Sequence, residues 1–292
     1  MNLSPRERAM LREMGVAWPQ APQRVQPAVA AAAAAKVATG PLHKDVGEGP
    51  AEAASVKQPV TPPAVASAWP PNATWDALQA AVSSCKRCGL CETRRRTVFG
   101  VGHPGAQWMV VGEAPGEQED RQGEPFVGAA GQLLDRMLGS IGLGRATEPT
   151  DDPSARGVRS AGRSGHAAHQ VFITNTVKCR PPQNRNPEPA ELAACEPVLH
   201  RQMELVQPRL VLAMGRFAAQ QLLRTEEPIG RLRGRVHRLT GEGVQWAGAQ
   251  GVPVVVTYHP AYLLRNPIDK AKAWDDLCLA LDTMDALRVD ER

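Results

Sequence analysis

The chain has 292 residues, a formal net charge of +4, a pI near 8.8 and six cysteines. This length allows one large domain or two smaller ones, and the mild positive charge permits a nucleic-acid partner without requiring one. Six cysteines in a chain of this length are too few for a disulfide scaffold.

The start of the chain carries Glu7 and Glu13 and lacks an apolar stretch before a cleavage site, so it does not resemble a secretory signal. The alanine run at 28–35 is too short to cross a bilayer. We therefore expect an intracellular protein with reduced thiols and no membrane segment.

The first 73 residues differ in composition from the rest of the chain. Residues 4–14 predict a short amphipathic helix within segment 1–18, with Ser4 as its N-cap and Gly15 at its end. This helix is either a peptide that docks on a protein partner or a terminus without a role. Residues 19–73 are rich in Ala and Pro and predict a disordered tether. We expect one folded domain over residues 74–292.

Apolar strands and helices alternate along this domain. The expected strands are residues 107–111, 171–175, 209–215 and 252–260, and the expected helices are residues 74–85, 131–143, 189–206, 216–224 and 269–288. This alternation predicts an α/β fold with a mostly parallel sheet and helices on both faces. The polar stretch 147–169 predicts a mobile surface loop, and residues 231–239 with 244–246 predict a small hairpin.

Polar side chains follow the expected strands at the point where each strand ends. Glu113, Asn175 and His259 come after the first, second and fourth strands. Ligands of open α/β sheets bind at the carboxyl ends of the strands. Turn formation explains the neighbouring glycines, but it does not explain why an acid, an amide and an imidazole share this edge.

The cysteines are spaced as metal ligands. Cys85, Cys88 and Cys91 follow a two-residue spacing, but the fourth Cys-Pro of a bacterial ferredoxin run is absent. Cys179 and Cys195 form a second, wider pair, so a four-thiolate site is predicted from Cys85, Cys88, Cys179 and Cys195.

Two points stay open at this stage. Spacing alone does not distinguish zinc from an iron–sulfur cluster. Cys91 is either an alternative ligand or a nearby thiol, and Cys278 lies on the apolar face of the last helix, as a core residue would.

Five motifs together carry a resemblance. They are CKRCGLCETRRRTVFGVG, GEAPGEQEDRQGEPFVGAAGQLLDRML, ITNTVKCRPPQNRNPEPAELAAC, LAMG and YHPAYLLR. Over residues 76–288 the sequence resembles the family 4, iron–sulfur uracil-DNA glycosylases. The resemblance implies a three-layer α/β/α sandwich with a four-stranded, mostly parallel central sheet. It also implies a structural 4Fe–4S cluster on the four cysteines, hydrolysis of the N-glycosidic bond of deoxyuridine in DNA, and a role in base excision repair.

The resemblance also implies roles for residues around the base. An Asn side chain accepts a hydrogen bond from uracil N3–H and donates one to O4, which suits Asn175. Phe126 would stack on the flipped base, and His259 would act as a neutral donor to uracil O2, where the leaving charge gathers.

The attacking water has no obvious activator. In a better-known branch of the superfamily the first motif is Gly-Gln-Asp-Pro-Tyr, and its Asp positions the water. Here Ala114 stands at the Asp position and Gly116 at the Tyr position. Glu113 is the nearest carboxylate, with Glu117, Glu119 and Asp120 as further candidates. We expect the backbone of this segment, from Gly112 to Gly116, to contact the base.

DNA should be held mainly through phosphate contacts from basic side chains. Those named for this role are Arg94, Arg95, Arg96, Lys178, Arg180, Arg185, Arg231, Arg233, Arg235 and Arg265. Tyr262, Leu263 and Leu264 either wedge into the space left by the flipped base or pack at the start of a helix.

Three rival hypotheses compete with the glycosylase. They are a non-catalytic DNA- or polymerase-docking module, an electron-transfer iron–sulfur protein, and a superfamily member trapped covalently on its abasic product. The presence of Asn175, His259 and Phe126 together argues against the first. We expect a monomeric, prokaryotic, cytoplasmic enzyme associated with the nucleoid, acting on uracil-containing DNA.

Overall fold

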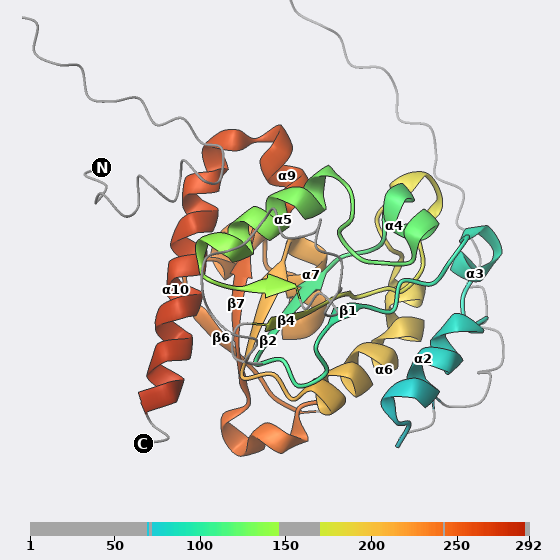
Figure 1. The fold of residues 1–292 in the computed structure, drawn as a ribbon, viewed down its shortest axis with the longest axis horizontal. Coiled ribbons are helices and arrows are strands. Elements are labelled where there is room, and N and C mark those ends of the chain that lie inside the picture. The colour runs from blue at the N-terminus through green and yellow to red at the C-terminus, as the bar shows by residue number, and fades with distance from the viewer. Residues whose placement is uncertain (1–68, 70–71, 146–169, 242, 290–292) are drawn as a thin grey trace, which may run out of the picture. The chain divides into compact units, whose positions relative to one another are not determined.

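The computed structural model describes residues 69, 72–145, 170–241 and 243–289 (Figure 1). The helix predicted at 4–14, most of the tether predicted at 19–73 and the loop predicted at 147–169 lie outside these residues. Trp69 and Ala73, at the end of the predicted tether, contact the folded domain. The Trp69 indole N–H donates to the carbonyl of Ala194, and the Ala73 carbonyl accepts from Arg201 Nε at 2.8 Å. Contacts of the folded domain therefore begin before residue 74.

The helices and strands alternate as the sequence predicts. The helices are α2 (Trp75–Ser83), α3 (Leu90–Thr93), α4 (Glu117–Gln122), α5 (Ala129–Ser140), α6 (Pro189–Val206), α7 (Arg216–Leu223), α8 (Ile229–Leu232), α9 (Pro260–Arg265) and α10 (Lys270–Val289). Three short 3-10 helices are η3 (Pro182–Asn184), η4 (Gln245–Gln250) and η5 (Pro267–Asp269). The strands are β1 (Val101–Gly102), β2 (Trp108–Gly112), β3 (Gly144–Arg145), β4 (Gln170–Asn175), β5 (Leu210–Met214), β6 (Val236–Leu239) and β7 (Val252–Thr257).

The seven strands form one sheet in the order β1-β4-β2-β5-β7-β6, and β3 also pairs with β4. The neighbours among β4, β2, β5 and β7 are all parallel, which confirms the predicted four-stranded parallel core. Short strands extend this core: β3 is parallel to β4, whereas β1 and β6 pair antiparallel. Because all four central strands run the same way, their carboxyl ends meet at one edge.

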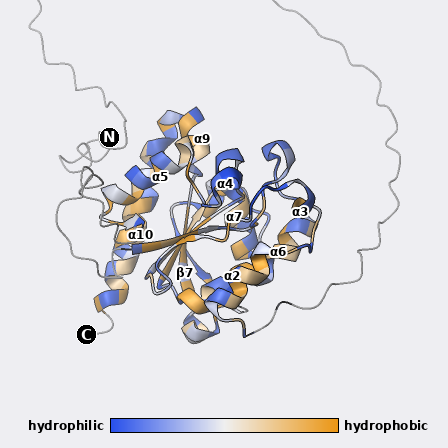
Figure 2. Ribbon diagram, turned by 45° about the vertical axis from the view of Figure 1, so that its right-hand side comes forward, coloured by the Kyte–Doolittle hydropathy of each residue, from blue (hydrophilic) through white to orange (hydrophobic). Residues whose placement is uncertain are grey.

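Helices cover both faces of the sheet, since successive side chains of a strand point to opposite sides. Trp108 and Val110 of β2 belong to a core shared with α5, α9 and α10. Met109 and Val111 belong to a second core shared with α6, α7 and α8. Figure 2 shows the central strand β7 as apolar, while α4 is hydrophilic. This is the predicted three-layer arrangement.

The predicted hairpin is wrong in part. Residues 244–246 lie at and within η4 instead of forming a strand, and β6 pairs directly with β7. Ile229–Leu232 forms α8 because Pro228 starts a helical turn there, so Arg231 and Arg233 do not lie on a strand. Strands β1 and β3 were not predicted, because two-residue strands have no periodicity and depend on pairing with β4.

No helix in the described part of the chain is both long and apolar enough to span a bilayer.

Candidate active site

A cavity of about 740 Å³ opens at the carboxyl ends of the central strands. The residues named from the sequence that line it are Glu113, Ala114, Gly116, Glu119, Phe126, Asn175, Arg185, His259, Tyr262 and Arg265. Gly112, Arg180, Leu263 and Leu264 do not line it. The parallel sheet thus brings together segments that are far apart in sequence, as the topology of α/β folds predicts.

Asn175 ends strand β4 and is only 2% exposed. Its Oδ1 is buried and has no hydrogen-bond partner among the described residues. Gly112 lies opposite Asn175 in the sheet, and a Cβ at Gly112 would come within 2.4 Å of Asn175 Oδ1 and 2.5 Å of the Phe126 ring. A buried amide oxygen without a partner costs about 1–3 kcal/mol. The site therefore holds an acceptor ready for a donor from a ligand.

Phe126 is held in a backbone conformation that side-chain-bearing residues rarely adopt, with φ of 56°. Its ring is 5% exposed and stacks on the His259 ring, with centroids 5.3 Å apart and planes 28° from parallel. Arg145 fixes the turn, donating from Nη1 to the Pro125 carbonyl at 2.8 Å and from Nη2 to the Phe126 carbonyl at 2.5 Å. Gly131 is also required, since a Cβ there would overlap the Phe126 carbonyl.

His259 caps the N-terminus of α9, where its Nδ1 accepts a hydrogen bond from the Ala261 N–H at 3.2 Å. The neutral ring with an accepting Nδ1 carries its proton on Nε2. Burial, assisted by the nearby Arg265, lowers the pKa of His259 to about 4. His259 is therefore a neutral imidazole with an Nε2–H donor near neutral pH.

The candidate carboxylates differ in their hydrogen-bond and ion-pair partners. Glu119 accepts from the N–H groups of Gly116, Val127 and Gly128, and Asp120 accepts from the Arg95 N–H at 2.9 Å. These two acids shape loops, and Glu117 pairs with Arg121 on the surface. Glu113 and Glu119 both line the cavity, but Glu113 is not engaged in holding a loop. Burial raises the pKa of Glu113, and Arg216 opposes that rise.

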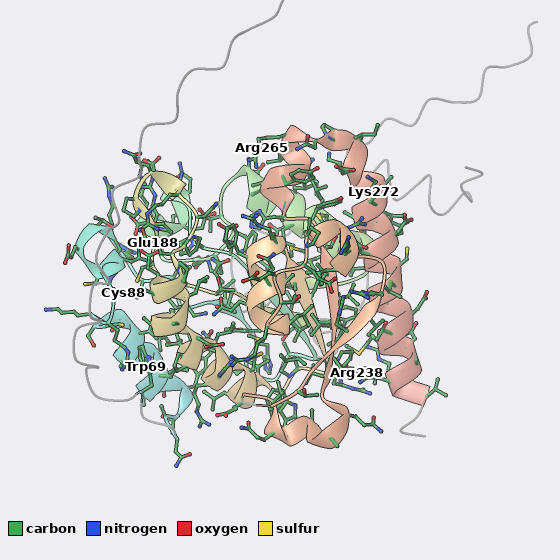
Figure 3. The ribbon with its side chains drawn as sticks, turned by 180° about the vertical axis from the view of Figure 1, so that it is seen from behind. Trp69, Cys88, Glu188, Arg238, Arg265 and Lys272 are labelled. Carbon is green, nitrogen blue, oxygen red and sulfur yellow. The ribbon has the colours of Figure 1, made fainter. Side chains whose placement is uncertain are left out.

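Three of the residues named for DNA contacts lie at or beside the cavity. Arg265 and Arg185 line the cavity, and Arg185 also donates to Glu191 at 2.6 Å and 2.9 Å. Arg180 lies nearby and donates to Asn184 at 2.7 Å. Figure 3 shows Arg265 on α9, on a different part of the domain from Cys88 and Trp69.

Several of these expectations are corrected by burial. Leu263 is 0% exposed and belongs to the core beneath α9, so it is not a surface wedge, whereas Leu264 is 44% exposed. Lys178 is 1% exposed and therefore does not face DNA. Arg233 pairs with the buried Asp276 at 2.7 Å, and Arg94 donates to Cys179 Sγ at 3.2 Å.

Sequence reasoning missed two basic residues at the site. Arg216 lines the cavity directly after Gly215, and the same strand-end rule that selected His259 also applies to it. Arg145 holds the Phe126 turn from strand β3, and no local pattern marks such a contact because it depends on tertiary pairing.

The cysteines surround a second, smaller cavity. It is lined by Cys85, Cys88, Cys179 and Cys195, together with Trp69 and Lys178, and not by Cys91. Burial raises the pKa of the Cys179 thiol to about 11 and that of the Cys195 thiol to about 12. All four are free thiols, and Cys278 packs partly buried against the core.

Among the described residues, no three Cys, His, Asp or Glu side chains are grouped closely enough to hold a single metal ion.

Comparisons with known proteins place the chain in a family. The model of the uracil DNA glycosylase superfamily matches residues 99–278. The type-4 uracil-DNA glycosylase of Sulfurisphaera tokodaii is 40% identical over 188 residues, covering 64% of this chain and 74% of the relative. That of Archaeoglobus fulgidus is 40% identical over 190 residues, covering 64% and 81%. That of Pyrobaculum aerophilum is 36% identical over 206 residues, covering 69% and 90%. The chain therefore belongs to the uracil DNA glycosylase superfamily and, within it, to the type-4 uracil-DNA glycosylases.

Proposed function

We propose that this protein hydrolyses the N-glycosidic bond of deoxyuridine in DNA and releases free uracil, leaving an abasic site. The observation that carries the proposal is the buried, unpartnered Oδ1 of Asn175 beside the neutral His259 and the Phe126 ring. A DNA base must be flipped from the stack to enter such a cavity, at a few kcal/mol of unstacking. The reaction is the first step of base excision repair.

Asn175 reads the base in this proposal. Its Oδ1 accepts from uracil N3–H, and its amide N–H donates to uracil O4. Cytosine carries the opposite pattern at these positions and leaves buried polar groups unpaired, at about 1–3 kcal/mol per group. Phe126 stacks on the base, and the backbone from Gly112 through Ala114 to Gly116 borders it.

His259 and Glu113 act on the bond that breaks. The His259 Nε2–H donates to uracil O2, where negative charge gathers as the bond to C1′ lengthens. Because the ring is already neutral, it stabilises this charge without transferring a proton. Glu113, as the carboxylate not used to shape a loop, orients the water that attacks C1′.

DNA passes the mouth of the cavity in this proposal. Arg180, Arg185 and Arg265 contact phosphates, and the exposed Leu264 occupies the space that the flipped base leaves. We propose that the protein acts as a monomer in the cytoplasm, on the nucleoid, where its substrate lies. The segments 1–18 and 19–73 then carry a docking helix on a tether, and 147–169 is an insertion loop.

The cysteine cavity is proposed to hold a 4Fe–4S cluster on Cys85, Cys88, Cys179 and Cys195. The donor set fits, since four thiols from two distant segments face one cavity and Arg94 donates to one of them. Bound there, such a cluster would serve as a cross-link, because hydrolysis of this bond involves no redox step. Its four ligands would join the segment before β1 to the segment that follows β4, the strand that ends at Asn175.

The test is base release from a duplex and a single strand that each contain one uracil. Alkali cleaves the abasic product, so strand scission reports the reaction. We expect scission of both uracil strands, none of matched thymine or cytosine strands, and little scission of any strand by Asn175→Ala. Tight DNA binding without scission would contradict the proposal and would favour a docking module.

A further inference from the structure

Lys178 is a buried lysine without a carboxylate partner among the described residues. It is 1% exposed, and no carboxylate of the described residues lies within ion-pair distance of its Nζ. Glu191 lines the same cysteine cavity, but both of its oxygens accept from Arg185, at 2.6 Å and 2.9 Å. A buried ammonium group is stable only beside hydrogen-bond acceptors or an opposite charge, so the groups around Lys178 decide what it does.

Four thiols line the cavity beside Lys178, together with Glu191 and the guanidinium groups of Arg87 and Arg94. Lys178 lines the cavity together with the four cysteines, so its ammonium group lies beside the place where four thiolates would hold a metal cluster. Thiols lose their protons when they bind a metal, so a bound cluster would bring negative charge next to this enclosed ammonium group.

The Lys178 ammonium group also contacts the end of strand β4. Its Nζ donates to the Asn175 carbonyl at 2.6 Å and to Thr174 Oγ1 at 2.6 Å. Thr174 Oγ1 in turn donates to the Phe99 carbonyl at 2.9 Å, which orients its lone pairs toward Lys178. One ammonium group therefore touches the end of β4, where Asn175 begins the turn that leads to Cys179.

We infer that Lys178 is the counter-charge of the thiolate-bound cluster and a positioning residue for Asn175. It would thereby connect the cluster to the side chain that recognises uracil. The second half of this inference rests on the proposed function. The role differs from that of a DNA-contacting lysine, since the side chain is enclosed.

The test compares holoenzyme variants loaded to the same iron content. Lys178→Met keeps the apolar length and removes the charge and both hydrogen bonds. Arg94→Met is the matched control, because Arg94 donates to Cys179 Sγ and to the Cys85 carbonyl at 2.7 Å without contacting Asn175. The readouts are the reduction potential of the cluster, the rate of its loss to a chelator, and kcat and KM for uracil release.

Both variants should shift the reduction potential to a more negative value, because each removes a positive charge beside the cluster. Both should also lose the cluster faster, by about 10–100-fold. Lys178→Met alone should lower kcat/KM, by about tenfold, because a buried hydrogen bond to the Asn175 backbone is lost. Lys178→Arg keeps the charge and should keep the wild-type potential.

If Lys178→Met cannot retain the cluster while Lys178→Arg does, the result would support the same inference, because the two variants differ in whether the side chain carries a positive charge. An unchanged potential in Lys178→Met would overturn the counter-charge, and a shifted potential with unchanged uracil kinetics would overturn the link to Asn175. If the wild type releases no uracil, the proposed function fails, and the potentials still decide the counter-charge.

Discussion

The ring of Phe126 stacks on the imidazole of His259, with centroids 5.3 Å apart and planes 28° from parallel. The two residues come from segments that are 133 positions apart, after β2 and after β7. Their contact forms one wall of the cavity, and Asn175 approaches Phe126 closely across Gly112. The arrangement gives a stacking surface, a neutral donor and an amide in one site.

Gly112→Ala should disable the site without unfolding the domain. The new Cβ would lie 2.4 Å from Asn175 Oδ1 and 2.5 Å from the Phe126 ring, so at least one of them must move. A displacement of about 1 Å lowers kcat by about 100-fold. Steady-state kinetics of uracil release measure the loss. Gly139→Ala is the control, because a Cβ there meets nothing within 4 Å; equal losses in both variants would contradict the packing argument.

His259 should not titrate in the activity profile near neutral pH. Its folded-state pKa is about 4, below the ordinary value of 6.5, so the neutral donor persists down to about pH 4. Single-turnover rates between pH 8 and 5 should therefore show no step that His259→Gln removes. A rate that rises as His259 becomes protonated near pH 6 would contradict a neutral donor.

The same shift predicts how stability depends on pH. A histidine with a lowered folded pKa contributes stability that is present above pH 6.5 and is lost as pH falls from 6.5 to about 4, because the unfolded chain binds the proton first. The free energy of unfolding measured with urea should therefore fall over this pH range by more in the wild type than in His259→Gln. Parallel curves for the two proteins would contradict the buried neutral state.

Glu113→Gln should remove the acid limb of the rate profile. Burial raises the pKa of Glu113, so in the wild type the rate should fall with decreasing pH at a value above that of an exposed glutamate. The variant should be about 100-fold slower and independent of pH on that side. Single-turnover rates measure both effects. Glu117→Gln serves as the control, since Glu117 pairs with Arg121 on the surface.

Arg145→Met should loosen the Phe126 turn, because two carbonyl contacts are lost. We expect kcat/KM to fall about tenfold, with Arg145→Lys partly restoring it. Asp135→Asn removes the surface partner of Arg145 and should have little effect. Activity at the wild-type level in Arg145→Met would show that packing around Gly131 alone fixes the turn.

Much of this structure was predictable from the sequence, and the exceptions have physical causes. Helix α6 (Pro189–Val206) matches the predicted range because Pro189 marks its first position and apolar residues recur along it. Asn175 and His259 were found because strand ends of a parallel sheet converge. For Leu263 the sequence left a DNA wedge and helix packing open, and the structure shows packing, because the turn after His259 continues as α9 and buries that side chain.

The remaining differences depend on contacts between distant segments. Lys178 looks like a surface lysine in the sequence, and only the packing of β4 against the cysteine cavity buries it. The role of Arg145 likewise depends on the short pairing of β3 with β4. Neither leaves a local pattern.

Single cysteine substitutions should distinguish the cysteines that bind the cluster from those that do not. Cys195→Ser should lower the bound iron and the visible absorbance, since Cys195 lines the cavity. Cys91→Ser should retain both, because Cys91 does not line it. Iron and acid-labile sulfide assays on the purified variants provide the measurement. Equal retention in the two variants would contradict the proposed ligand set.

The central claim is that the cavity excises uracil and reads it through Asn175. The most direct measurement is the single-turnover rate of free-uracil release, with enzyme in excess, for wild type, Asn175→Ala and the control Asn266→Ala. DNA affinity is measured alongside by fluorescence anisotropy. The account predicts release by wild type and Asn266→Ala and a large loss of rate in Asn175→Ala, with DNA affinity retained in all three. Release by Asn175→Ala at the wild-type rate would contradict it.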